Sequence, residues 1–578
     1  MKVERIAASE SSGASAAWLR ALAMTATIPK QPARTLPVAI EELAAARGDA
    51  PALLADGECL TFAMLAARAR SYGRWALLEG VGKGDVVCLV MPNRPDYLAI
   101  WLGITGVGGI VALLNTNLTG PALAHCIDIV EPKHIIVADE LSAAFDSARP
   151  HLSSDARVWP HGEISLAGGE APAAPPVTID DCALYIYTSG TTGLPKAAKV
   201  SHRRLMTWSA WFAGMIGTRP EDRMYNCLPM YHSVGGVVAT GAVLLGGGSV
   251  AIRDKFSASR FWDDVVRFDC TLFQYIGELC RYLVHAPAHP QENGHRLRLA
   301  VGNGLRPDVW NAFKDRFKIP QILEFYASTE GNVTLFNAEG KPGAIGRTPG
   351  FLAHRSAVAL VKFDVDTSEP VRDADGFCVR CAADETGEAL GQLAEGGIGG
   401  RFEGYTGAEE TQKKILRDVF RPGDAWFRTG DLMRKDAAGF YYFEDRVGDT
   451  FRWNGENVSS TEVAQAICEC PGVAEATVYG VAVPGRDGRA GMAAIAGTPD
   501  LAALWAHLAK RLPVYARPVF LRLTAPLEIT ATFKHRKNDL MREGVDAPSV
   551  FIADRERGAY VPLDTTLLAR VKAGALRL

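Results

Sequence analysis

Short apolar runs that alternate with longer helical patterns are the feature that most limits how this chain can fold. The clearest runs are residues 85–91, 134–138, 183–188, 297–301 and 322–326. A short apolar run bounded by turn residues is typical of a buried strand, and strands that alternate with helices indicate βαβ units. We therefore predict an α/β fold with largely parallel sheets through the first three quarters of the chain.

The sequence changes character after about residue 446 and predicts a second, smaller domain. The elements expected there are a helix near 461–469, strands near 474–483 and 492–496, and a helix at 501–512. These have the size of a small α+β domain, and 578 residues exceed what one hydrophobic core usually holds. The predicted division is an N-terminal domain at 1–446, a hinge at 447–449 and a mobile C-terminal domain at 450–578.

Composition and charge weigh against several classes of protein. Lys and Arg number 62 and Asp and Glu 65, a balance that gives no reason to expect nucleic acid as a partner. Eleven cysteines without regular spacing favour a reducing cytoplasmic setting. Residues 1–12 lack the apolar core of a secretory signal, so export is not expected. Nothing in the sequence predicts an oligomeric state.

Two close cysteine pairs raise the question of a metal site. Cys378 and Cys381 form a C-x-x-C, and Cys468 and Cys470 form a C-x-C. A structural zinc site needs closed tetrahedral coordination, and residues 376–381 read as a strand, in which positions three apart point to opposite faces. We therefore predict that these thiols are buried in ordinary packing.

The strongest chemical signal is a hydroxyl-rich loop that follows an apolar strand. From Tyr187 to Lys196 the sequence reads Tyr-Thr-Ser-Gly-Thr-Thr-Gly-Leu-Pro-Lys. Glycines let the backbone N–H groups converge, the hydroxyls add donors, and Lys196 brings a mobile positive charge, which suits a polyphosphate. The loop is not a Walker A sequence, because no Gly-Lys-Ser/Thr is present.

The loop closely resembles the phosphate-binding signature of adenylate-forming enzymes, which include acyl-CoA synthetases, peptide-synthetase adenylation domains and firefly luciferases. Further resemblances follow in the family's order along nearly the whole chain. The nucleotide-binding residues that the resemblance implies are Thr188, Ser189, Gly190, Thr191, Thr192, Gly193 and Lys196 at the phosphates, Gly302, Asn303 and Gly304 beside the adenine, Tyr326, Ala327, Ser328 and Thr329 in the segment that stacks on adenine, and Asp431 and Arg446 at the ribose. Gly455 resembles a close-approach point for the pantetheine of coenzyme A.

The catalytic residues that the resemblance implies are Lys534, Glu330, Thr191 and His232. A carboxylate that attacks the α-phosphate of ATP brings two anions together, and magnesium plus lysine offset the charge of the transition state. Glu330 supplies an oxygen ligand of the kind that Mg²⁺ prefers. His232 falls where the family has a histidine between the acyl pocket and the pantetheine tunnel.

The chain departs from the family pattern at two positions. Gly448 stands at the hinge position that is commonly Asp or Lys, and Phe533 replaces the usual glycine before the catalytic lysine. Lys537 therefore stays open as the alternative to Lys534. Either lysine lies in the small domain, so the resemblance implies that this domain closes over the nucleotide during adenylation.

Three further stretches narrow the resemblance to fatty-acid transport proteins and very-long-chain acyl-CoA synthetases. They are residues 113–118, 325–332 and 449–458. The implied function is an ATP-dependent fatty acyl-CoA synthetase that uses ATP, Mg²⁺ and coenzyme A and forms an acyl-adenylate. The alternatives are a CoA ligase for a bulky steroid or bile acid, a fatty-acid uptake or binding protein with weak ligase activity, and a binding module for adenine nucleotides.

Two apolar stretches bear on membrane contact. Residues 233–252 are uncharged but contain six glycines, so a buried glycine-rich segment is a better prediction than a membrane span. Residues 17–28 have the character of a segment that can lie on a surface, and a fatty substrate partitions into bilayers. We expect a cytoplasmic protein and leave peripheral association with the inner face of a membrane open.

Overall fold

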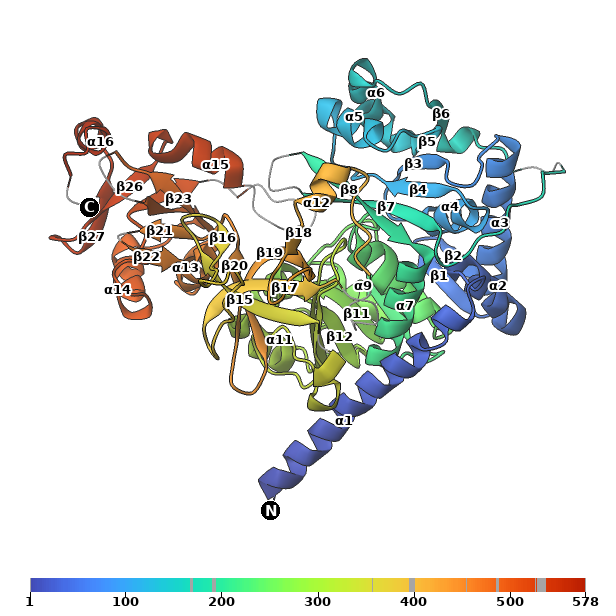
Figure 1. Cartoon of the computed structure of the whole chain (residues 1–578), viewed down its shortest axis with the longest axis horizontal. Coiled ribbons are helices and arrows are strands. Elements are labelled where there is room, and N and C mark those ends of the chain that lie inside the picture. Colours follow the sequence, from blue (N-terminus) through green and yellow to red (C-terminus); the bar gives the residue numbers. More distant parts are fainter. Residues whose placement is uncertain are drawn as a thin grey trace. The chain divides into compact units, whose positions relative to one another are not determined.

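The structure is a computed structural model that describes residues 2–166, 170–189, 194–355, 357–393, 401–453, 455–484, 488–524, 527 and 537–576, with the backbone alone for 2–12, Ser189 and Asn538. The chain forms two compact units, each built from two pieces of sequence (Figure 1). The larger unit contains residues 1–357 and 391–416, and the smaller contains 358–390 and 417–578. The hinge predicted at 447–449 lies within the smaller unit and stays a prediction.

One sheet of the larger unit has six strands in the order β6-β5-β3-β4-β7-β8. The strands are β3 (Val86–Val90), β4 (Ile110–Leu113), β5 (His134–Val137), β6 (Arg157–Pro160), β7 (Cys182–Ser189) and β8 (Pro195–Ser201). All neighbours are parallel except β7 and β8, which form an antiparallel pair. Helices α4 (Pro95–Gly106) and α5 (Gly120–Asp128) lie between consecutive strands in the sequence, as the βαβ prediction requires.

The second sheet has eight strands in the order β14-β13-β12-β11-β9-β10-β1-β2. The strands are β1 (Pro51–Ala55), β2 (Glu58–Thr61), β9 (Arg223–Asn226), β10 (Ser249–Ile252), β11 (Leu272–Ile276), β12 (Leu299–Asn303), β13 (Gln321–Ala327) and β14 (Thr334–Asn337). Its central strands are parallel, and β2 and β14 close the two edges in antiparallel pairs. The parallel-rich α/β prediction is confirmed.

Helices α1 (Lys2–Thr25) and α7 (His202–Ile216) pack together on the larger unit. Trp18 of α1 meets Trp211 of α7 edge to face, with ring centroids 5.6 Å apart, and Trp18 is almost fully buried. The segment expected to lie on a surface thus uses its apolar face inside the protein. It leaves Leu19 and Met24 exposed.

The glycine-rich stretch 233–252 is buried, as predicted. It forms a π-helix, η5 (Val234–Val238), then α8 (Ala239–Leu244) and strand β10. A Cβ at Gly236 would collide with the carbonyl oxygen of Met230, so only glycine allows this close approach. Among the residues that the structure describes, no helix combines the length and apolar character needed to cross a membrane.

Most of a third sheet belongs to the smaller unit; its strand order is β16-β15-β17-β19-β18, and β20 pairs with β19. These strands are β15 (Val358–Asp364), β16 (Glu369–Pro370), β17 (Thr386–Gln392), β18 (Ile415–Arg417), β19 (Ala425–Lys435) and β20 (Tyr441–Arg446). The predicted strand at 376–381 is wrong. Cys378 and Arg380 form only isolated bridges, because the N–H groups bond to different parts of the chain: Phe377 donates to Asp373 Oδ1 in a turn, and Cys378 donates to the Val419 carbonyl oxygen.

The C-terminal part of the smaller unit is the predicted α+β arrangement. Five strands, in the order β23-β24-β25-β26-β27, span Val473–Ala482, Arg489–Gly497, Phe520–Thr524, Val550–Asp554 and Ala559–Pro562. Helices α13 (Ser460–Cys468), α14 (Leu501–Arg511), α15 (Lys537–Glu543) and α16 (Thr565–Lys572) accompany them, and a hairpin of β21 (Phe451–Trp453) and β22 (Glu456–Val458) precedes α13. The four helix and strand predictions for 461–512 match α13, β23, β24 and α14 within three residues at each end.

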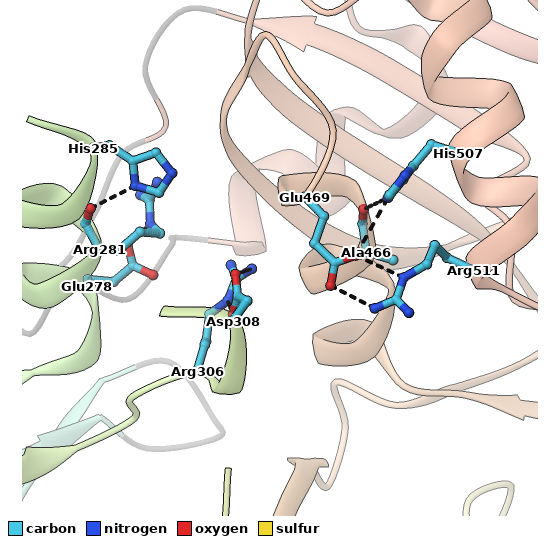
Figure 2. Close-up of polar contacts among 9 residues, drawn as sticks. All are labelled: Glu278, Arg281, His285, Arg306, Asp308, Ala466, Glu469, His507 and Arg511. Atoms are coloured by element: carbon cyan, nitrogen blue, oxygen red, sulfur yellow. Dashed lines mark hydrogen bonds and ion pairs between the residues drawn. The ribbon is translucent and has the colours of Figure 1, made fainter. Parts of the chain in front are cut away.

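Polar contacts hold the ends of several helices (Figure 2). In the smaller unit, Glu469 after α13 accepts two hydrogen bonds of 2.8 Å from Arg511 at the end of α14. His507 Nε2 lies 2.9 Å from the carbonyl oxygen of Ala466, so this nitrogen carries the proton. In the larger unit, His285 closes helix α10 (Gly277–His285) by the same type of contact with the Arg281 carbonyl oxygen.

Candidate functional site

The predicted phosphate loop connects two neighbouring antiparallel strands. Thr188 on β7 lies opposite Lys196 on β8, and Ser189 lies opposite Pro195. The structure therefore brings Thr188 and Lys196 together at the end of this hairpin. Gly190, Thr191, Thr192 and Gly193 lie outside the described residues, and so does the side chain of Ser189.

Glu330 lies in a tightly held turn after β13. Its side chain is 9% exposed, and its Oε1 accepts a 2.9 Å hydrogen bond from the hydroxyl of Tyr405. The hydroxyls of Thr329 and Ser233 lie 3.1 Å apart and tie the turn to the start of η5. The buried guanidinium of Arg204 donates to the carbonyl oxygens of Thr329, Gly331 and Arg401.

Tyr405 and Arg204 are site residues that the sequence did not indicate. Tyr405 follows the turn by 75 residues, and Arg204 lies in the first turn of α7, so neither belongs to a local pattern that announces a site. Both are buried, and burial lowers the pKa of Arg204 and raises that of Tyr405. They fix the backbone and the carboxylate of the Glu330 turn.

The loop predicted beside the adenine follows β12 and rests on a buried carboxyl group. Gly302 lies opposite Tyr275 of β11, and a Cβ at Gly302 would overlap the Tyr275 ring. Glu324 of β13 accepts from the Leu305 N–H at 3.1 Å and from the Tyr275 hydroxyl. Burial raises the pKa of Glu324 to about 8. Gly304 has a φ of +79°, which glycine adopts without strain.

Two buried polar atoms lie at the carboxyl ends of β12 and β13. Asn303 Oδ1 and Ser328 Oγ have no hydrogen-bond partner among the residues that the structure describes. Leaving such an atom buried and unpaired costs about 1–3 kcal/mol, so a ligand or water is expected to satisfy it. Tyr326 is half-buried at the end of β13, and Ala327 is exposed beside it. This edge therefore has the donors, acceptors and aromatic ring that an adenine nucleotide needs.

His232 lies between Tyr231 and Ser233, just before the π-helix. Its ring centroid is 4.6 Å from that of Tyr231, and its side chain is half-buried. Asn226 donates from Nδ2 to the Gly235 carbonyl oxygen at 2.8 Å and holds η5 against β9. The chain thus connects His232 through Ser233 to the Glu330 turn, and the predicted role of His232 stays a prediction.

The residues predicted at the ribose face each other in the smaller unit. Asp431 of β19 is paired in register with Arg446 of β20, and Arg446 Nε lies 3.6 Å from Asp431 Oδ1. The Asp431 N–H donates to Thr429 Oγ1 at 3.0 Å. Glu388, which the sequence did not indicate, forms an ion pair of 2.9 Å with Arg428 and accepts from the Gly430 N–H. This network fixes the turn that presents Asp431.

The predicted hinge region has a dense network around Asp445. This carboxylate accepts from the Ser460 N–H at 2.7 Å, and burial raises its pKa. Lys537, the alternative catalytic lysine, lies 3.0 Å from Asp449 and donates to Ser460 Oγ at 2.9 Å. Gly455, predicted near pantetheine, has a φ of +85°, and a Cβ there would meet none of the described residues within 4 Å. Lys534 lies outside the described residues.

The donor set suits one hard cation bound together with phosphate. No group of three or more His, Cys, Asp or Glu residues that could hold a metal ion occurs among the described residues. Mg²⁺ usually takes one or two protein carboxylates and completes its shell with water and phosphate oxygens. Glu330, with one oxygen already oriented by Tyr405, fits that requirement.

Solved structures share this fold. The anthranilate CoA ligase AuaEII, in complex with anthranoyl-AMP, aligns with a TM-score of 0.74 at 22% identity, over 88% of this chain and 96% of that chain. ATP-bound MatB from Rhodopseudomonas palustris aligns with a TM-score of 0.73 at 24% identity, over 88% and 99% of the two chains. The Mycobacterium tuberculosis fatty acyl CoA synthetase aligns with a TM-score of 0.62 at 20% identity, over 88% of this chain and 98% of that chain. The fold is that of adenylate-forming enzymes.

Comparison of sequences identifies the family more narrowly than comparison of folds. The AMP-binding enzyme family matches residues 40–388, and the AMP-binding enzyme C-terminal domain matches residues 462–534. Long-chain fatty acid transport protein 1 of Mus musculus is 41% identical over 94% of this chain and 88% of its own length. Long-chain fatty acid transport protein 2 of Rattus norvegicus is 40% identical over 95% of this chain and 92% of its own length. The chain belongs to the AMP-binding enzyme family and, within it, to the long-chain fatty acid transport proteins, which confirms the resemblance.

Proposed function

We propose that the protein is an ATP-dependent fatty acyl-CoA synthetase. It converts a long- to very-long-chain fatty acid, ATP and coenzyme A into acyl-CoA, AMP and diphosphate through an acyl-adenylate. The observation that carries the proposal is the carboxylate of Glu330, held by Tyr405 close to the phosphate strand that bears Lys196. The names of the transport-protein relatives support a long-chain acid as the substrate.

In the first half-reaction the acid carboxylate attacks the α-phosphate of ATP and releases diphosphate. Lys196 and Lys534 offset the negative charge, and Glu330 holds Mg²⁺, which neutralises phosphate charge when bound. Asn303 and Ser328 offer the adenine edge their unpaired oxygens. Asp431 accepts hydrogen bonds from both ribose hydroxyls, and Arg446 lies beside it.

In the second half-reaction the thiol of coenzyme A attacks the mixed anhydride and AMP leaves. AMP is already a good leaving group, so no protein nucleophile is required and positioning suffices. The exposed position of Gly455, where a Cβ would meet no described residue within 4 Å, supports its role beside pantetheine. His232, placed before η5, orients the acyl carboxylate.

Two other functions stay in competition. A CoA ligase for a bulky steroid or bile acid uses the same nucleotide chemistry and differs only in the acid. A fatty-acid uptake or binding protein with weak ligase activity is favoured by the word transport in the names of the relatives. A pure adenine-nucleotide binding module fits less well, because it has no need for the roles expected of His232 at the acyl carboxylate and of Lys534 in adenylation.

The deciding experiment is thioester formation by the purified protein with ATP and coenzyme A. Fatty acids from short to very long and one bile acid serve as substrates, and diphosphate release is followed in parallel. A thioester that forms best with long chains supports the proposal, and preference for the bile acid supports the bulky-acid ligase. Diphosphate without thioester indicates another acceptor of the acyl group. If neither product forms, the result favours uptake or binding alone.

The proposal also covers the location of the protein in the cell. We infer a cytoplasmic protein that meets its substrate at the inner face of a membrane, supported by the exposed Leu19 and Met24 on α1. Flotation with lipid vesicles tests this directly. A protein that stays at the bottom of the gradient with and without fatty acid contradicts peripheral association.

A further inference from the structure

Residues 401–406, which we call the brace, lie beside β8, the strand that carries Lys196. The Thr406 N–H donates to the Ala197 carbonyl oxygen at 3.0 Å, and the Lys199 N–H donates to the Gly404 carbonyl oxygen at 3.0 Å. Tyr405 forms an antiparallel bridge with Ala198. The brace therefore extends the phosphate hairpin by one short antiparallel stretch.

Side chains join the brace to β8 and to the Glu330 turn. The carboxylate of Glu403 accepts from the N–H and the hydroxyl of Ser201 at 2.7 and 2.5 Å. The guanidinium of Arg204 donates to the Arg401 carbonyl oxygen and to two carbonyl oxygens of the turn. One buried cation thus fixes the brace and the turn in a single arrangement.

Tyr405 is the brace residue whose side chain reaches the Glu330 carboxylate. Its hydroxyl donates to Glu330 Oε1 at 2.9 Å. Lys196 Nζ lies 5.9 Å from the centroid of the Tyr405 ring. Because Tyr405 is 5% exposed, its hydroxyl has little access to water as an alternative partner. One phenol therefore links the carboxylate, the phosphate strand and the lysine.

We propose that Tyr405 is a positioning residue for the divalent cation that accompanies ATP. Its hydroxyl holds the Glu330 carboxylate in one orientation before the cation arrives, so less freedom is lost on binding. This inference rests on the proposed function. It adds Tyr405 to the residues of the proposed site, and Tyr405 lies beyond residues 40–388, the segment that matches the AMP-binding enzyme family.

The test is Tyr405→Phe, which removes the hydroxyl and keeps the ring. We expect the Mg²⁺ concentration that half-saturates acid-dependent diphosphate release to rise about tenfold, with an unchanged KM for the acid. Binding of Mn²⁺ in the presence of a non-hydrolysable ATP analogue, followed by electron paramagnetic resonance, should weaken by the same factor. Tyr72→Phe is the control, because it removes another buried hydroxyl, placed 2.9 Å from His161 Nε2.

A double-mutant cycle separates positioning from a general structural effect. In the Glu330→Ala background, Tyr405→Phe should cause no further loss of Mn²⁺ affinity. Additive losses would overturn the inference, and so would unchanged Mg²⁺ and Mn²⁺ dependence in Tyr405→Phe. If the unmodified protein forms no adenylate with any acid, the proposed function fails, whereas the Mn²⁺ measurement still decides the role of Tyr405. Thermal unfolding confirms that each variant is folded at the assay temperature.

Discussion

Glu324 places a carboxyl group where few proteins have one, enclosed beneath the loop predicted to border the adenine. Removal from water makes ionisation costly and raises the pKa of this carboxyl group to about 8. The Tyr275 hydroxyl and the Leu305 N–H bind its two oxygens and partly offset that cost. Glu324 therefore supports the loop at the expense of stability at neutral and alkaline pH.

The first prediction concerns Glu324→Gln, an uncharged variant of the same shape. Between the usual glutamate pKa of 4.5 and about 8, the unfolded chain loses the Glu324 proton while the folded protein keeps it, so stability falls as the pH rises. The stability of the variant lacks this decrease with rising pH, because glutamine does not ionise. We expect its free energy of unfolding to gain on that of the parent between pH 5 and 8, by on the order of 1.4 kcal/mol per pH unit, with a constant gap above pH 8. A gap independent of pH would show that the carboxyl group ionises normally.

The second prediction separates the two candidate lysines. Lys534→Ala should slow adenylation about 100-fold and leave thioester formation from supplied acyl-adenylate largely intact. Lys537→Ala should instead lower stability by about 1 kcal/mol, because Lys537 is bound to Asp449 and Ser460. Both half-reactions are measured with each variant. Equal loss of both steps in Lys534→Ala, or selective loss of adenylation in Lys537→Ala, would reverse the assignment.

Among the elements, the π-helix η5 depends most on a single residue type. Gly235 and Gly236 bring its backbone against the carbonyl oxygens of residues 228–230, where a side chain has no space. A π-helix is rare and often occurs at functional sites. Here it begins two residues after His232 and is held by Asn226. We infer that η5 places His232 and Ser233 relative to the Glu330 turn.

The third prediction tests this placement with Gly236→Ala. The added methyl group should destabilise the larger unit by about 1–3 kcal/mol and lower adenylation more than ATP binding. Gly350→Ala is the matched control, because a Cβ at Gly350 meets nothing within 4 Å. Thermal unfolding and diphosphate release provide the two measurements. If both variants behave alike, the close packing at Gly236 does not matter.

The sequence predicts the position of a strand well where burial alone determines which residues form it. The runs at 85–91 and 322–326 became β3 and β13, because strands buried on both faces are mostly apolar. The strand prediction for 376–381 is wrong because its N–H groups bond to different parts of the chain, with Phe377 donating to Asp373 in a turn and Cys378 to the Val419 carbonyl oxygen. The sequence predicts site residues where the spacing of glycines or hydroxyls is local, as at Thr188 and Lys196, and these assignments stay predictions. Tyr405 and Glu388 were missed because their partners lie 75 and 40 residues away.

At the scale of the whole molecule, the fourth prediction concerns Gly448. Its φ of +93° is unavailable to proline, whose ring fixes φ near −65°. Gly448→Pro therefore excludes the backbone conformation described here. If residues 447–449 form a hinge, the half-reaction that uses this conformation should be lost while the other persists, and Gly448→Ala should have a milder effect. Equal impairment of both half-reactions would argue against a hinge.

The division of the chain into units has a consequence for its synthesis. The larger unit needs residues 391–416, which include the brace, and the smaller unit needs residues 358–390. A ribosome must therefore make part of the second unit before the first has all its sequence. A nascent chain that ends at residue 388, where the family match ends, lacks the brace. We expect protease resistance of the larger unit to appear during translation only after residue 416 has left the ribosome.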